Sequence, residues 1–260
     1  MKASRLLLGA YVVVFLLALY TPIAVLVGLS FNASKIVYVW AGFSTRWYQE
    51  IFRTPQYTNA LNASLWIAIL TTLLSVVLGA LAGIAIARRP GRYALAWDAL
   101  VLLPLIMPEI IEALSILLFY KVVGIRNGVG ATVLGHTVFS VSFVALIVRA
   151  RMGDVGKSYE EASMVLGASR AETFLRVLLP LAAPAIVAGA FLAFAASFDD
   201  VVKSSFTTSV DSRTLPLLVF AAAARGGISP LLNALATVMV IISLSAAYLR
   251  TLAERRISRG

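Results

Sequence analysis

The sequence contains no cysteine, and only one of its 260 residues, His136, is a histidine. Without cysteine the chain has no disulfide framework, no thiolate metal site and no thiol redox chemistry. One imidazole is too few for a metal site built from several histidines. Charged residues are also scarce, at 13% of the chain, which is about half the share of an ordinary soluble domain. These absences argue against thiolate and multi-histidine metal sites, disulfide-bonded secreted folds and typical soluble proteins.

Apolar residues are abundant instead, at 60% of the chain, and the mean hydropathy is +0.92. Stretches with few or no charges lie at residues 6–34, 54–87, 99–120, 127–148, 177–202 and 226–249. Each is long enough to cross a hydrocarbon core of about 30 Å as a helix, which takes about 20 residues. Strands are not expected, because the stretches lack strict alternation and an open sheet edge cannot lie in lipid.

The sequence therefore predicts an all-α, polytopic membrane protein whose residues 1–260 form a single transmembrane domain. Six transmembrane helices are expected near residues 6–30, 60–87, 97–120, 131–150, 181–203 and 231–250. The first follows two basic residues, as a signal peptide would. Its apolar run exceeds the about 7–15 residues of a signal-peptide core, so we predict a retained span.

The distribution of Lys and Arg predicts the orientation of these spans. Fourteen of the 22 basic residues lie in segments 1–5, 88–92, 149–176 and 250–260. The other eight lie in segments 31–58, 121–130 and 203–230, whose combined length is greater. Because basic residues concentrate on the cytoplasmic side, both termini are expected to be cytoplasmic. The net charge of +10 is then spread over one membrane face, where it suits anionic lipid and not nucleic acid.

The segment 31–58 is rich in aromatic residues, among them Trp40, Trp47, Tyr48 and Tyr57. Aromatic side chains of this kind form belts at the membrane interface, so we predict an interfacial loop with a short surface helix. The alternative is that the loop contacts an external partner.

The cytoplasmic loop 151–180 is predicted to contain two short helices. Ser158 and Glu161 have the spacing of a capping box at a helix start. Gly167 suits the left-handed turn that ends a helix. The capping-box spacing recurs from Ser169, so a second helix is expected there.

The spacing within this loop resembles the cytoplasmic signature of permeases of ABC-type, binding-protein-dependent importers. That signature reads Glu-Ala-Ala, three residues, Gly, nine residues, Ile, one residue, Leu-Pro. The matching residues here are Glu161, Ala162, Ser163, Gly167, Val177, Leu179 and Pro180. The segment differs from this signature at two positions, where Ser163 replaces Ala and Val177 replaces Ile.

The resemblance extends over about residues 60–250 and is greatest to the spermidine/putrescine branch, C-type subunit. Similar segments are 103–109, 197–202, 204–206, 215–216 and 229–237. Glu112 departs from that pattern, because an apolar residue is expected at its position.

The resemblance implies a type I importer permease (MetI-like) core whose loop helix docks on a cytoplasmic ATPase. It assigns ATPase coupling to Glu161, Ala162, Ser163, Gly167, Leu179 and Pro180. The implied partners are a second permease, which is an identical or a sister chain, two ATPase subunits and an extracytoplasmic binding protein. ATP and Mg would be bound by the ATPase, with no cofactor on this chain. The implied location is a prokaryotic plasma (inner) membrane.

The chain itself lacks the motifs of ATP hydrolysis. Its Gly156-Lys157-Ser158 ends like a phosphate-binding loop, but Arg151 occupies the place of the required first glycine. The Gly-x-Ser-x-Gly and His-Glu-x-x-His motifs are also absent. A non-catalytic transport subunit is therefore expected.

Four carboxylates fall within or at the ends of the predicted spans: Glu109, Glu112, Asp199 and Asp200. Each costs about 2.5–3.5 kcal/mol near the bilayer centre, so a functional reason is expected. Glu109 and Glu112 share a helix face, and Pro108 breaks the helix beside them, which is tolerated where it lines a cavity. We predict that these acids line a path for a cationic solute. The alternative is that they lie at the headgroup level, paired with Lys121, Arg126 or Lys203.

Phe194, Phe198 and His136 also fall within the predicted spans. Phe198, with Phe194, offers aromatic surface to an aliphatic amine chain, and packing between helices is its alternative. His136 is expected to be a satisfied hydrogen-bonding group between helices, and no role is assigned to it.

The prediction is thus the permease subunit of an ATP-driven importer, with a polyamine or similar small cation as its cargo. Importers of ferric iron, thiamine or organophosphonates are alternatives within the family. A stand-alone secondary transporter should show inverted repeats, and an intramembrane enzyme should pair a nucleophile with a base. Neither pattern occurs in the sequence.

Overall fold

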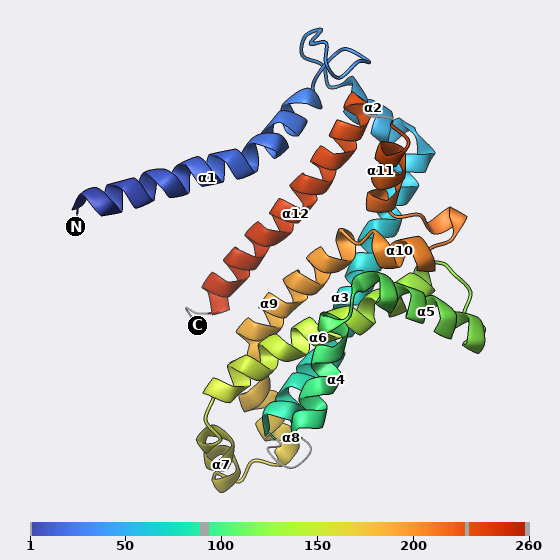
Figure 1. Ribbon diagram of the computed structural model, residues 1–260. Coiled ribbons are helices and arrows are strands. Elements are labelled where there is room, and N and C mark those ends of the chain that lie inside the picture. Colours follow the sequence, from blue (N-terminus) through green and yellow to red (C-terminus); the bar gives the residue numbers. More distant parts are fainter. Residues whose placement is uncertain (1, 89–93, 227–228, 258–260) are drawn as a thin grey trace. The chain divides into compact units, whose positions relative to one another are not determined.

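The computed structural model describes residues 2–88, 94–226 and 229–257, and these are mainly helical (Figure 1). Four long helices coincide with predicted spans one, two, four and six: α1 (Lys2–Leu29), α3 (Pro55–Arg88), α6 (Val129–Asp154) and α12 (Pro230–Ile257). Within these described ranges, five helical segments are long and apolar enough to cross a membrane, or six if one bent pair counts as a span. The predicted all-α fold is confirmed. Most of the basic loop 88–92 falls outside the described residues.

The chain divides into two compact units, residues 1–58 with 219–242 and residues 59–218 with 243–260. In the first unit, α1 leads into a loop and the short helix α2 (Arg46–Arg53), which is the helix expected there. Trp47 is buried, and its indole N–H donates a hydrogen bond of 2.8 Å to the carbonyl of Asn32. Trp47 is therefore a packing residue of the loop, unlike Trp40, which is 56% exposed.

In the second unit, α6 packs along α9 (Leu179–Phe198), and together they supply most of the hydrophobic core (Figure 1). Small residues allow this close packing. A Cβ atom on Gly189 of α9 would lie 3.2 Å from the Cα of Val144 on α6. A Cβ atom on Gly79 of α3 would lie 2.6 Å from the Cβ of the same valine. Glycine thus lets the backbones of three helices meet around one β-branched side chain.

The third predicted span is broken, not a single helix over 97–120. Its two parts, α4 (Ala94–Ile106) and α5 (Glu109–Val123), meet at an angle of 104°. The break falls at Pro108, which caps α5 with extended backbone (φ −56°, ψ 128°). Proline provides no N–H for a continuous helix and clashes with the preceding turn.

The fifth predicted span, expected over 181–203, also ends early. α9 stops at Phe198, residues 199–201 are not helical, and the short helix α10 (Val202–Thr207) follows. The Asp200 carboxylate accepts a 2.8 Å hydrogen bond from the backbone N–H of Ser204. Short acidic side chains that bind backbone N–H groups favour such helix starts over continued helix.

The remaining elements are short. Beyond the ends of α6 and α9 lie α7 (Ser158–Val165), α8 (Arg170–Thr173) and a π-helical turn, Phe174–Leu178, that joins α8 to α9 (Figure 1). After α10 come a 3-10 turn, Val210–Ser212, and α11 (Leu215–Ala224). The N–H of Leu215 donates to the hydroxyl of Ser64 at 2.8 Å, which fixes the start of α11 against α3.

Candidate functional site

The loop predicted to couple to an ATPase is a helix–turn–helix. Gly167, which follows α7, has φ +91°. Its N–H donates to the carbonyl of Met164, and the N–H of Ala168 donates to that of Ser163. These two bonds form the Schellman motif, which satisfies the last carbonyls of α7 and requires the left-handed backbone that glycine adopts cheaply.

The second predicted capping box is confirmed and the first is wrong. At the start of α8, Ser169 and Glu172 exchange both capping hydrogen bonds, at 3.2 and 2.9 Å. Ser158, in contrast, is the first residue of α7, and the residue before it makes no side-chain cap. Three of the first four N–H groups of α7, those of Tyr159, Glu160 and Glu161, donate instead to carbonyls of Gly156 and Lys157.

The tip of this loop is exposed. Glu161, Ala162 and Gly167 all lie on the surface, and the apolar side chains of Val165 and Leu166 are 86% and 88% exposed. Exposed apolar side chains that are contiguous in this way mark interaction surfaces. Ser163 differs, because its hydroxyl lies 3.1 Å from that of Thr173 and ties α7 to α8.

Leu179 and Pro180 occupy another part of the loop, at the start of α9. The N–H of Leu179 bonds to the carbonyl of Phe174, five residues earlier, which closes the π-helical turn. Pro180 has no N–H and its ring needs room over the preceding turn, so the wider turn fits there. These two residues set how the chain enters α9, whereas the exposed tip belongs to α7.

Arg88, which the sequence reasoning did not single out, connects three helices at this end of the unit. From the last turn of α3 its guanidinium forms an ion pair with Glu160 of α7. It also donates to the carbonyls of Met152 and Val155, at the end of α6, at 2.7 and 3.0 Å. A cavity of about 620 Å³ adjoins the pair, with Leu81, Met164 and Phe174 in its wall.

Three of the four predicted intramembrane acids, Glu109, Glu112 and Asp200, surround the ammonium group of Lys203, on α10. Its Nζ lies 2.6 Å from Oε1 of Glu109, 3.0 Å from Oδ2 of Asp200 and 3.9 Å from Oε2 of Glu112. The Lys203 side chain is 3% exposed and that of Asp200 2%, whereas that of Glu109 is 49% exposed. From the sequence alone, Lys203 is only one of three alternative partners of these acids. A lysine three residues after Asp200, at helical spacing, was the signal that could have identified it.

His136 forms the other half of this cluster and is the interhelical hydrogen-bonding group that was expected. Its Nδ1 lies 2.8 Å from the hydroxyl of Ser197. Its Nε2 lies 3.2 Å from both the hydroxyl of Ser204 and Oδ1 of Asp200. The buried imidazole thus joins α6 to α9 and α10 across the break in the fifth span.

Two predicted path residues lie apart from the Lys203 ammonium. Asp199 is exposed at the end of α9. Phe198 is buried, and its ring stacks on that of Phe194 with centroids 5.7 Å apart. The structure therefore brings Glu109, Glu112 and Asp200 together, while Phe198 packs inside the bundle.

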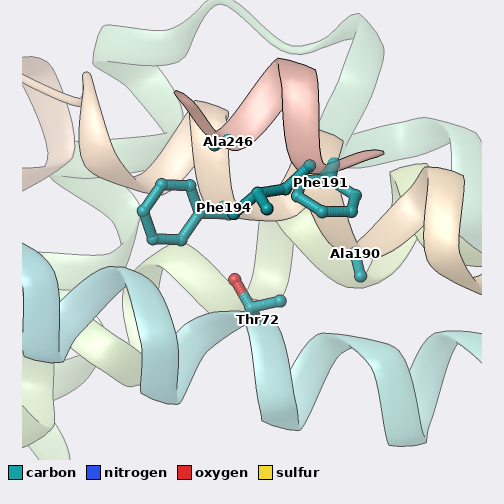
Figure 2. A pocket seen from close by; sticks show the side chains of 6 residues that line it. Thr72, Ala190, Phe191, Phe194 and Ala246 are labelled. Carbon is teal, nitrogen blue, oxygen red and sulfur yellow. The ribbon is translucent and has the colours of Figure 1, made fainter. Parts of the chain in front are cut away.

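A separate cavity of about 270 Å³ lies between α3, α9 and the end of α12. Figure 2 shows Phe191 and Phe194 of α9 on one side and Thr72 of α3 on the other. The Thr72 hydroxyl donates a hydrogen bond of 2.7 Å to the carbonyl of Ala68 within its own helix. Ala190, Ala246 and Leu249 also line the cavity, and its wall is almost entirely apolar.

The sequence is similar to known transport proteins over most of its length. Residues 75–259 match the family described as "Binding-protein-dependent transport system inner membrane component". The chain is 38% identical over 252 residues to the putrescine transport system permease protein PotI of Escherichia coli (strain K12), which covers 92% of this chain and 88% of that protein. It is 35% identical over 248 residues to the spermidine/putrescine transport system permease protein PotC of Haemophilus influenzae, with coverages of 95% and 96%.

Solved structures with a similar fold are also found. A bacterial ABC transporter involved in the import of the acidic polysaccharide alginate matches with a TM-score of 0.75 at 13% identity, over 95% of each chain. The MetNI methionine ABC transporter, in an inward-facing conformation, matches with a TM-score of 0.68 at 19% identity, over 78% of this chain and 96% of that one. At these identities the likeness supports the fold alone. Since the family match spans well over half of its residues, the chain belongs to the inner-membrane components of binding-protein-dependent transport systems.

Proposed function

We propose that this chain is the permease subunit of an ATP-driven importer whose cargo is a polyamine of the putrescine or spermidine class. The observation that carries the proposal is its likeness, over nearly its whole length, to permeases of putrescine and spermidine/putrescine transport systems. Three carboxylates gathered around an ammonium group agree with a cationic cargo. An anionic cargo would be repelled by the same groups.

The exposed tip of α7 is proposed to dock on a cytoplasmic ATPase that binds ATP and Mg. Val165 and Leu166 supply apolar contact area beside Glu161 and Ala162, and the turn at Gly167 keeps the tip rigid. Rigid docking lets closure of an ATPase dimer move the helices as bodies. Both termini are then cytoplasmic, as the basic residues indicate.

The chain is further proposed to work as one permease domain and to form half of the path. The other half would be a second permease, and an extracytoplasmic binding protein would deliver the cargo. Glu109 and Glu112 would face the path, and the broken backbone at Pro108 suits a cavity lining. Asp200 would lie at the buried end of that acidic surface.

The test is ATP-dependent uptake of labelled putrescine and spermidine by the complete complex in vesicles, with its binding protein supplied. Uptake that requires ATP, and that disappears when Gly167 is replaced by a bulky residue, supports both the cargo and the coupling tip. A complex that assembles and hydrolyses ATP, yet takes up neither polyamine, rules out this cargo.

A further inference from the structure

The Lys203 ammonium has the surroundings of a bound ligand. Two carboxylate oxygens, from Glu109 and Asp200, lie within 3.0 Å of Nζ. Nζ also lies 4.5 Å from the centroid of the Phe139 ring, on α6. Carboxylates combined with an aromatic face are the groups that recognise alkylammonium ions.

Glu112 shows that this site is not fully used by Lys203. The residue is 5% exposed, and neither of its carboxylate oxygens has a hydrogen-bond partner. Its nearest cation is Nζ of Lys203, at 3.9 Å, beyond hydrogen-bond distance. A buried carboxylate without a partner is costly, so a further donor is expected to complete the site.

Room for an alkyl chain adjoins Glu112. A cavity of about 280 Å³ at the bend between α4 and α5 is lined by Glu112 together with Met107, Ile116 and Phe119. This volume is close to the lower bound of small-molecule pockets, about 300 Å³. The cavity therefore offers one carboxylate at an otherwise largely apolar wall, as an alkylamine requires.

The formal charges leave the site able to accept another cation. Three carboxylates face a single ammonium group, and the imidazole of His136 is engaged by Ser197, Ser204 and Asp200. Glu109 is about half exposed and forms the accessible rim, whereas Glu112 and Asp200 are buried behind it. An arriving ammonium ion would therefore meet Glu109 first.

We propose that Glu109, Glu112, Asp200 and Phe139 form a binding site for a primary ammonium group, which Lys203 occupies in this conformation and yields to an ammonium group of the cargo. This inference rests on the proposed function for the identity of the cargo. Lys203 would keep its contact with Asp200, three residues away on the same segment, while the incoming ammonium takes Glu109 and Glu112. The lysine thus acts as a built-in competitor that holds the site closed until cargo is present.

The test removes the competitor and asks whether a free amine takes its place. Lys203→Met in the complete complex, held in lipid nanodiscs, should bind labelled ethylammonium about tenfold more tightly than the wild type, if Lys203 fills the site about nine-tenths of the time. Tetramethylammonium, which has no N–H to donate, should not compete. Lys121→Met, on the same helix as Glu109 and Glu112 but outside the cluster, should bind ethylammonium as the wild type does.

Glu112→Gln added to Lys203→Met should abolish the gain in ethylammonium binding. A Lys203→Met complex that is folded but binds ethylammonium no better than the wild type overturns the inference. If Lys203→Met fails to assemble, ethylammonium present during purification should restore assembly, and failure to restore it also counts against the site.

Polyamine uptake by the wild type separates the two proposals. Ethylammonium binding without uptake refutes the cargo alone, and uptake without a gain in binding refutes the ammonium site alone.

Discussion

Arg88, in the last turn of α3, forms an ion pair with Glu160, in the first turn of α7, and the same guanidinium caps the carbonyl end of α6. The two side chains are largely buried, at 13% and 20% exposure. One side chain thus links the proposed coupling helix to two membrane helices. A displacement of α7 would be transmitted directly to α3 and α6 through this contact.

We expect Arg88→Gln and Glu160→Gln each to lower uptake by about 2- to 30-fold, the range for residues that carry coupling between sites. ATP hydrolysis without cargo should persist, because neither residue belongs to the exposed tip of α7. The measurement is the number of cargo molecules moved per ATP hydrolysed. The charge-reversed pair Arg88→Glu with Glu160→Arg should recover part of the loss. A double variant no better than the single variants would refute a role for the pair in coupling.

Gly167→Val should uncouple the permease from ATP hydrolysis. A β-branched residue at φ +91° costs about 1–2 kcal/mol and would unwind the Schellman turn that shapes the tip. The matched control is Gly153→Ala, at a helical glycine near the end of α6 where an added Cβ would have nothing within 4 Å. Normal binding-protein-stimulated ATP hydrolysis in Gly167→Val would show that the turn is dispensable.

Glu109→Gln should raise the cargo concentration needed for half-maximal uptake about threefold. The effect is expected to be this small because an ion contact made by a half-exposed side chain contributes little binding free energy. Docking of the ATPase should be unchanged, since the cluster lies at the opposite end of α9 from α7 (Figure 1). Asp211→Asn, an exposed acid in the 3-10 turn, serves as the control. Unchanged uptake by Glu109→Gln would remove Glu109 from the path.

Gly79→Ala should destabilise the folded chain by about 1–3 kcal/mol, the usual cost of overpacking. The added methyl would lie 2.6 Å from the Cβ of Val144 and 2.9 Å from the carbonyl oxygen of Val141, and backbone cannot move aside cheaply. The thermal midpoint in detergent measures the effect. Gly130 is a helical glycine of α6 where an added Cβ would have nothing within 4 Å. Gly130→Ala should therefore leave the thermal midpoint unchanged. Equal midpoints for the two variants would mean that α3 and α6 lie farther apart.

Much of this protein is readable from local patterns. Apolar runs long enough to cross a bilayer predict the long helices, because in lipid a chain must satisfy its own backbone hydrogen bonds. The turn at Gly167 and the cap at Ser169 follow from contacts between near neighbours in the chain. The coupling signature is likewise a local spacing, so it indicates the family without reference to any tertiary contact.

The breaks within spans and the partners of the buried charges depend on contacts between distant parts of the chain. Apolar composition alone extends the fifth span through Asp200, but that carboxylate binds the N–H of Ser204 and starts a new helix. Arg88 gave no local signal, because its partners lie 64 or more residues away. Lys203 and Glu109 are 94 residues apart. The packing of α5, α6 and α10 decides which of several distant charged residues come into contact. A buried charge needs an oppositely charged or hydrogen-bonding partner, and only the fold determines which residue is close enough to provide it.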